Sequence, residues 1–219
     1  MRVRSVLCLL ALSAAAGARS PTPANETVHE ICERVDAHYN RLSSLKERFE
    51  EIYQGAGTSR TESGVLWLRR PGKMRWEYEQ PRAKLFVSDG KNVWFYVPGE
   101  ADARRATLKR LDDLRSPLRY LLGKTKLEKE FSDLQIRTSP PGQTTLRGFP
   151  KAMSGQVRDV ELSINAESQI EYIRIHETDG SITEFRFRDI VEDAPAPANL
   201  FHFSPPPGVG VISSEELAP

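Results

Sequence analysis

Residues 84–97 read KLFVSDGKNVWFYV, two β-rich runs on either side of Asp89-Gly90. An Asp-Gly pair flanked by alternating apolar residues is the strongest short signal for a β-hairpin. Both faces of this hairpin are apolar, with Phe86, Val93 and Phe95 on one and Leu85, Val87, Trp94 and Tyr96 on the other. This is typical either of a sheet covered on both sides or of a curved sheet whose inner face binds an apolar ligand.

Short alternating runs continue on both sides of the hairpin. In residues 74–79, Met74, Trp76 and Tyr78 face one way and charged residues the other, which predicts a strand with one apolar face. Further strands are predicted at residues 160–165, 170–176, 182–188 and 200–203, with Asp179-Gly180 as a second tight turn. Many short antiparallel strands joined by tight turns predict one large curved sheet, a sandwich or a barrel.

The N-terminal part of this region has the spacing of an amphipathic helix. Apolar residues recur at helical intervals from Glu26 to Leu42, and Asn25 is suitable as the N-cap. Residues 44–54 fit a continuing helix through Leu45, Phe49 and Ile52, although they also contain a period-2 row. The pattern by itself favours a helix for residues 44–54.

A second, very short helix is predicted at residues 116–122. Ser116 is suitable as the N-cap, Pro117 as the first helical residue and Gly123 as the C-cap. So short a helix is stable only when its leucines are buried against another part of the protein.

The first eighteen residues have the features of a secretory signal peptide. Arg2 and Arg4 precede the apolar residues 6–12, and residues 16–18 (AGA) form a cleavage site before Arg19. We therefore expect residues 1–18 to be removed and residues 19–219 to form one exported domain with no membrane anchor. Cys32 would then be the single cysteine, so we expect no internal disulfide.

The composition argues against several classes of function. The 31 Lys and Arg residues nearly balance the 30 Asp and Glu residues, whereas nucleic-acid-binding proteins normally show a basic excess. Gly123-Lys124-Thr125 resembles the end of a phosphate-binding loop, but Leu118 occupies the position where that motif needs Gly. No G-x-S-x-G motif occurs.

One group of potential metal ligands lies on the first predicted helix. His29, Cys32, Glu33 and Asp36 share one helix face, but no second cluster has ligand spacing and Cys32 belongs to the apolar stripe. We therefore expect no catalytic residues, no metal and no cofactor.

Several motifs follow one another over nearly the whole chain after the signal peptide. They are residues 64–71 (GVLWLRRP), 74–78 (MRWEY), Gln80-Pro81, 85–98 (LFVSDGKNVWFYVP), Asp179-Gly180 with the strand at 182–190, and 201–208 (FHFSPPPG). In these motifs and in their order the chain resembles a known family, the periplasmic outer-membrane lipoprotein carriers (LolA).

The resemblance implies a mainly β fold with some α structure, in which a single curved antiparallel sheet of about eleven strands forms an incomplete, unclosed β-barrel. Short helices close its mouth as a lid. It favours a strand at residues 44–54, contrary to the helical pattern, with the first helix ending near Leu42. In this family the Arg of the Arg-Pro pair, here Arg70, is associated with holding the lid closed.

The implied function is that of a periplasmic chaperone, a monomer that binds acylated lipoproteins rather than nucleic acid. It would receive them from an inner-membrane lipoprotein-releasing ABC transporter and deliver them to an outer-membrane receptor. We expect the acyl-binding cavity to be lined by Trp67, Met74, Trp76, Tyr78, Phe86 and Phe95. The lid would comprise Arg70, Leu118, Leu121 and Leu122.

Two other functions remain open on this evidence. A periplasmic domain that senses lipids or lipoproteins can share the scaffold, and a lipid-active hydrolase is the enzyme alternative.

Overall fold

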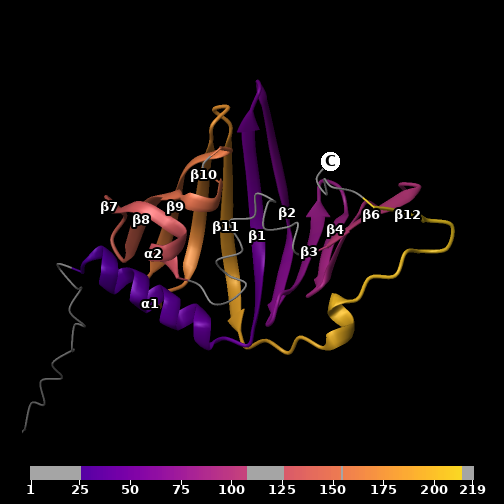
Figure 1. The fold of residues 1–219 in the computed structure, drawn as a ribbon, viewed down its shortest axis with the longest axis horizontal. Helices are drawn as coiled ribbons and strands as arrows, with labels where there is room; N and C mark the ends of the chain where they lie inside the picture. Colours follow the sequence, from indigo (N-terminus) through magenta and orange to yellow (C-terminus); the bar gives the residue numbers. More distant parts are fainter. Residues whose placement is uncertain (1–25, 108–125, 154, 214–219) are drawn as a thin grey trace, which may run out of the picture.

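The computed structural model describes residues 26–107, 126–153 and 155–213. The predicted signal peptide at residues 1–18 and the predicted lid helix at residues 116–122 both lie outside these residues. Within them the chain forms one twelve-stranded sheet, with a helix on one face and the C-terminal segment on the other (Figure 1).

The strands range from 4 residues (β12) to 12 residues (β1 and β2), and most strands that are consecutive in the chain are neighbours in the sheet. Their order is β12-β6-β5-β4-β3-β2-β1-β11-β10-β9-β8-β7. Their bounds are β1 Ser44–Gly55, β2 Thr58–Arg69, β3 Lys73–Gln80, β4 Lys84–Asp89, β5 Asn92–Tyr96, β6 Asp102–Thr107, β7 Phe131–Arg137, β8 Gln143–Pro150, β9 Val157–Asn165, β10 Ile170–Glu177, β11 Ile182–Glu192 and β12 Gly210–Ser213.

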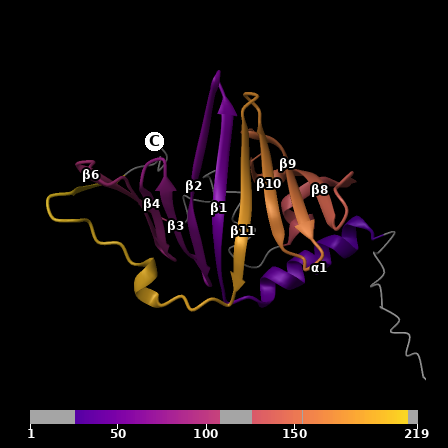
Figure 2. The same cartoon turned by 180° about the vertical axis from the view of Figure 1, so that it is seen from behind.

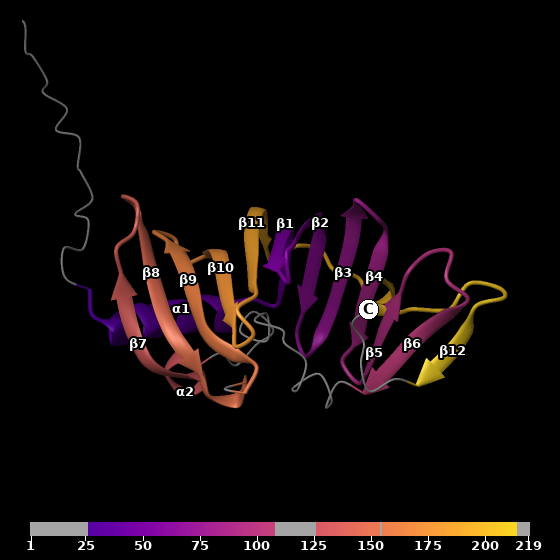
Figure 3. The ribbon, with the colours of Figure 1, turned by 90° about the horizontal axis from the view of Figure 1, so that it is seen from above.

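The sheet curves into an open arc whose two edges, β7 and β12, do not pair (Figure 3). This confirms the unclosed barrel. The described residues contain twelve strands rather than about eleven, and β12 pairs with β6 in parallel, whereas the other pairs are antiparallel.

The first helix, α1, spans Val28–Arg41 and packs on the sheet through Ile31, Val35 and Tyr39. Thr27, rather than Asn25, is the N-cap. Its side chain accepts a hydrogen bond from the main-chain N–H of Glu30, and the Glu30 carboxylate accepts one from the Thr27 N–H. Asn25 has Val28 three residues later, so it cannot form this reciprocal pair.

Residues 44–54 form strand β1, so the helical interpretation of their pattern was wrong. Leu42 is already extended, and β1 pairs with β2 along its full length and with β11 on its other side. Local spacing was misleading because Glu47, which interrupts the apolar row, is buried with it in the folded protein.

The predicted strand at residues 200–203 is instead the 3₁₀ helix η4 (Ala198–Phe201) followed by irregular chain. Pro197 precedes it and Pro205 to Pro207 follow, and proline cannot donate the hydrogen bonds of a sheet. This segment crosses β3 to β5 on the face of the sheet opposite to α1, which we call the outer side (Figure 2). There Phe203 contacts the rings of Trp94 and Tyr96.

The described residues contain two further small elements, α2 (Leu127–Glu130) near α1, and the 3₁₀ helix η3 (Lys151–Met153) after β8. Of the helices in the described residues, none has the length and apolar character needed to cross a membrane.

Candidate functional site

The sheet has an inner face, which we define as the face that carries α1. Alternation along β1 places Leu45, Glu47 and Phe49 on it. On β2 and β3, the cross-strand pairs Leu66–Trp76 and Leu68–Met74 lie on the same face. Apart from Glu47, the inner face is therefore an apolar surface across the middle of the sheet.

A cluster of aromatic rings occupies the centre of this face. The Phe49 ring lies 4.6 Å from the Trp76 ring and 4.9 Å from that of Tyr78 (centroid to centroid). Phe185 from β11 adds an edge-to-face contact with Trp76 at 5.8 Å and stacks on Phe187 at 6.2 Å. Edge-to-face and offset geometries are the favoured ones for such pairs, so the cluster is well packed.

The predicted residues Met74, Trp76 and Tyr78 all belong to this surface. Trp76 and Met74 are buried, and the Trp76 indole N–H donates to the Met74 sulfur at 2.9 Å. Cross-strand pairing of Trp76 with Phe86, and of Phe86 with Phe95, extends the surface to β5. Phe86 contacts both the central core and a smaller cluster around Phe95.

Trp67 does not join the other predicted cavity residues. It follows Leu66 on β2 and so points to the opposite face, where its ring lies 4.7 Å from the Lys46 ammonium. The structure thus separates Trp67 from Trp76 by the thickness of the sheet, and the prediction that they line one cavity was wrong.

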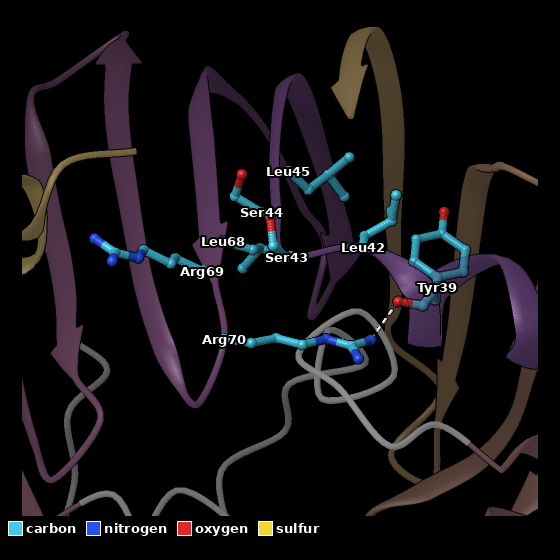
Figure 4. A pocket seen from close by; sticks show the side chains of 8 residues that line it. All are labelled: Tyr39, Leu42, Ser43, Ser44, Leu45, Leu68, Arg69 and Arg70. Atoms are coloured by element: carbon cyan, nitrogen blue, oxygen red, sulfur yellow. Dashed lines mark hydrogen bonds between the residues drawn. The ribbon is translucent and has the colours of Figure 1, made fainter. Parts of the chain in front are cut away.

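Arg70 lies in the turn between β2 and β3 and reaches the last turn of α1. Its guanidinium donates to the main-chain carbonyl oxygens of Asn40, at 2.7 Å, and Tyr39. It borders a small pocket between the end of α1, the start of β1 and the end of β2, where it points toward Tyr39 (Figure 4). Carbonyls of a helix C-terminal turn lack partners within the helix, and the guanidinium donates to two of them, although the Tyr39 carbonyl also accepts the main-chain N–H of Leu42 at 3.3 Å.

The expected contact of Arg70 with the lid leucines involves residues outside those described. Leu118, Leu121 and Leu122 all lie in the range 108–125, so the Arg70 hydrogen bonds named here connect the sheet to α1.

A polar group forms one end of the inner face, near the β1–β2 turn. The Tyr78 hydroxyl donates to Glu51 at 2.8 Å, and the Lys84 ammonium lies 2.6 Å from Glu62 and over the Tyr78 ring. Burial, followed by the nearby Glu51 carboxylate, raises the pKa of Tyr78 above its usual value. The tyrosine hydroxyl is therefore neutral and fixed by its hydrogen bond.

The possible metal ligands on α1, which are His29, Cys32, Glu33 and Asp36, make contacts within α1, with α2 and with the core. His29 pairs with Glu128 at 3.0 Å and Glu33 at 3.5 Å, Cys32 is buried in the core, and Asp36 accepts a hydrogen bond from the Leu127 N–H. A search of the described ranges for groups of three or more metal-ligating side chains finds none.

Sequence reasoning missed several residues of the inner face, namely Phe49, Leu66, Phe185, Phe187 and Glu47. Phe185 and Phe187 alternate along one predicted strand, so a signal for them was present. Phe49 and Glu47 were hidden by the helical spacing of residues 44–54.

Comparison with known proteins gives a consistent set of relatives. Residues 40–204 match the family described as "Outer membrane lipoprotein carrier protein LolA". An outer-membrane lipoprotein carrier protein of Nitrosospira multiformis is 35% identical over 155 residues, covering 70% of this chain and 73% of that protein. One from Methylococcus capsulatus is 31% identical over 186 residues, covering 83% and 87% of the two chains.

A solved structure of an uncharacterized conserved protein from Thermus thermophilus is also similar. It has a TM-score of 0.55 at 14% identity and covers 85% of this chain and 98% of its own. At that identity the likeness concerns the fold.

Proposed function

Because the chain belongs to the LolA family of outer membrane lipoprotein carrier proteins, we propose that it carries lipoproteins through the periplasm with their acyl chains held against the inner face. The observation that supports this most directly is the continuous apolar surface from Phe187 through Trp76 to Phe95, on a sheet that does not close. An unclosed sheet can widen without losing strand pairs.

The energetics explain why a carrier is needed. Each CH₂ group exposed to water costs about 0.8 kcal/mol, so one sixteen-carbon chain costs about 12 kcal/mol. Unaided transfer between two membranes is negligible at that cost. A carrier offers an apolar surface of similar quality on one face, while its outer face also carries charged side chains, among them Arg48, Glu50 and Arg186.

The described structure corresponds to a closed form of this site. Trp76 and Phe49 are buried against each other and against the core beneath α1. An acyl chain would therefore bind by separating these contacts. Arg70 connects the β2–β3 turn to the end of α1, and we propose that its hydrogen bonds stabilise the closed form until cargo arrives.

The proposal includes two membrane partners. An inner-membrane lipoprotein-releasing ABC transporter would supply the energy that opens the site, and an outer-membrane receptor would accept the lipoprotein by binding its acyl chains more tightly. The chain acts as a monomeric shuttle between them, and no step of this role requires catalysis.

The test is a release experiment with spheroplasts that display labelled lipoproteins on the inner membrane. The protein purified from a periplasmic fraction should move the label into the supernatant as a complex and then pass it to outer membranes. Label that stays on the spheroplasts would contradict the carrier role.

The same preparation separates the two alternatives. A lipid-active hydrolase would release free fatty acid from an ester substrate. A sensing domain would bind acyl lipid but would leave the label on the spheroplasts.

A further inference from the structure

One carboxyl group lies inside the apolar inner face without a partner among the described residues. Glu47 is 1% exposed, and neither of its two carboxyl oxygens has a hydrogen-bond partner in the described ranges 26–107, 126–153 and 155–213. Buried polar groups in folded proteins are nearly always satisfied, because leaving one unpaired costs free energy of folding. A group retained at this cost is a candidate for a ligand contact.

The residues around Glu47 on its face are apolar. Leu45 and Phe49 flank it on β1, and its cross-strand partner on β2 is Leu66, which in turn pairs with Trp76 on β3. Glu47 is therefore two strands from Trp76 in a single row across the surface that we assign to acyl chains.

The strand on the other side of Glu47 is irregular at the same point. Lys46 pairs with Val191 and Arg48 with Arg188, so two residues of β11, Asp189 and Ile190, oppose the single residue Glu47. Asp189 has a φ of 53°, as expected for a bulge. Bulges of this kind are frequent next to functional sites, where they change the direction of a side chain.

The environment of Glu47 favours its neutral form. Burial raises its pKa to about 8. The titratable groups on the neighbouring elements do not neutralise a carboxylate here. Tyr39 of α1 lies close enough for Glu47 to affect its pKa, but burial raises that pKa above its usual value, so Tyr39 is neutral and carries no positive charge. The acids further along the face, Glu51 and Glu62, are engaged with Tyr78 and Lys84, and Asp189 on the bulge is exposed.

We propose that Glu47 is a ligand-binding residue of the inner face, and that its carboxyl group donates a hydrogen bond to the ester carbonyl oxygen of a bound acyl group. A neutral carboxylic acid has one O–H donor, and an ester carbonyl offers only an acceptor, so the two are complementary. This inference rests on the proposed carrier function and adds a polar contact that selects acyl esters over plain hydrocarbon.

An ammonium group on the ligand is the competing partner. It would require an ionised Glu47 and the removal of two charges from water, and the attraction between them often fails to compensate that cost. The buried, unpartnered position therefore favours the ester carbonyl.

The experiment compares two fluorescent probes of equal chain length, the ethyl ester of pyrenyl-dodecanoic acid and pyrenyl-dodecane. Their affinities are measured with the full-length processed protein, and the ratio of ester to hydrocarbon affinity is the readout. The variants are Glu47→Leu, which removes the polar group, and Glu47→Gln, which keeps a donor. Glu50→Gln is the matched control, because Glu50 neighbours this segment on the opposite face and pairs with Arg186.

We expect Glu47→Leu to lower the ester-to-hydrocarbon ratio about threefold to tenfold, the range of one hydrogen bond, with hydrocarbon affinity retained. Glu47→Gln and Glu50→Gln should keep the ratio. Raising the pH above 8 should lower the ratio in the wild-type protein but not in Glu47→Gln.

Three results would overturn the proposal. If Glu47→Leu binds both probes with an unchanged ratio, the proposed ligand contact of Glu47 is wrong, but the carrier function is not contradicted. Tighter binding of pyrenyl-dodecylamine to wild type than to Glu47→Gln, increasing with pH, assigns the ammonium partner instead. Wild-type protein that binds neither probe contradicts the carrier function itself. Far-UV circular dichroism establishes that each variant is folded. The pH dependence of the ratio is measured only on the wild type and Glu47→Gln.

Discussion

The Arg70 guanidinium donates a 2.7 Å hydrogen bond to the main-chain carbonyl oxygen of Asn40, and so joins the β2–β3 turn to the end of α1. Its neighbour Arg69 makes a comparable bond of 2.8 Å, but to the carbonyl oxygen of Ala196 in the C-terminal segment on the outer side of the sheet. Two adjacent arginines thus hold different elements to opposite faces.

Arg70→Leu is predicted to leave the fold intact and to impair delivery of lipoprotein to outer membranes. Loss of the guanidinium leaves two carbonyls of α1 without this donor, at a cost of about 1 to 3 kcal/mol in the free energy of unfolding. The loss weakens the closed form relative to the open one, so bound acyl chains should leave the protein more slowly. Release from spheroplasts and transfer to outer membranes, measured separately, check this.

Arg69→Leu is the matched control for that prediction. It removes a hydrogen bond of the same kind from the outer face, so it should lower stability by a similar amount without changing transfer. Equal transfer defects in both variants would show that Arg70 acts through stability alone.

The strands around the 84–97 hairpin were predictable from the sequence, because alternation over five or more residues is a local property. The strand at residues 44–54 was not, since the acidic residues Glu47 and Glu51 lie on the inner face and disrupt the expected apolar pattern. Their burial depends on α1 and on strands far away in the sequence. For residues 44–54 the family resemblance correctly predicted a strand, whereas the local pattern predicted a helix.

The site was predictable to the extent that its residues share one strand. Met74, Trp76 and Tyr78 alternate along β3, and their common face is visible in the sequence. Whether Trp67 lies on the same face as these residues depends on the register, which places Leu66 opposite Trp76. A shift of one residue would move Trp67 to the inner face, and the register is set by pairing between strands rather than by local sequence.

The three tryptophans provide a direct test of which face binds acyl chains. Trp76 lies on the inner face, whereas Trp67 and Trp94 lie on the outer one, near Lys46 and Phe203. In single-tryptophan variants with the other two replaced by Phe, a brominated palmitoyl lipid should quench Trp76 fluorescence strongly and the other two weakly. Quenching requires near contact, so stronger quenching of Trp67 or Trp94 would place the acyl site on the outer face.

Asp159 gives a prediction about acid stability. It is fully buried and accepts hydrogen bonds from Arg147 at 2.9 Å, His176 at 2.7 Å and Arg158 at 3.0 Å. Burial opposes the charged form, but these hydrogen bonds together outweigh it and hold the pKa of Asp159 well below its usual range. The resulting stability is present above the ordinary aspartate pKa of about 4 and is lost as the pH falls below it.

Asp159→Asn should therefore lower the free energy of unfolding by about 3 kcal/mol at neutral pH, because it removes the buried anion that accepts charge-assisted hydrogen bonds from Arg147 and Arg158. The difference from wild type should shrink as the pH is lowered from about 5 to about 3. Urea unfolding at several pH values measures this, with Asp133→Asn, at an exposed position where the pairing of β7 with β8 is irregular, as the control. A difference that stays constant with pH would contradict the assignment.

Glu47 gives the opposite dependence on pH. Its pKa is raised to about 8 in the folded protein, whereas in the unfolded chain it is about 4.3. Between these two values the folded state holds a proton that the unfolded state has released, so Glu47 lowers stability increasingly as the pH rises and the effect is complete above about 8.

Glu47→Leu is thus predicted to stabilise the protein, by about 3 kcal/mol at pH 7 and by less near pH 5. Glu47→Gln should show the same loss of pH dependence with a smaller gain, because its amide remains buried without partners. Guanidinium unfolding from about pH 5 to pH 9 measures both. A gain that does not grow with pH would show that Glu47 ionises at its ordinary pKa in the folded protein, and its neutral form could not then act as a donor near pH 7.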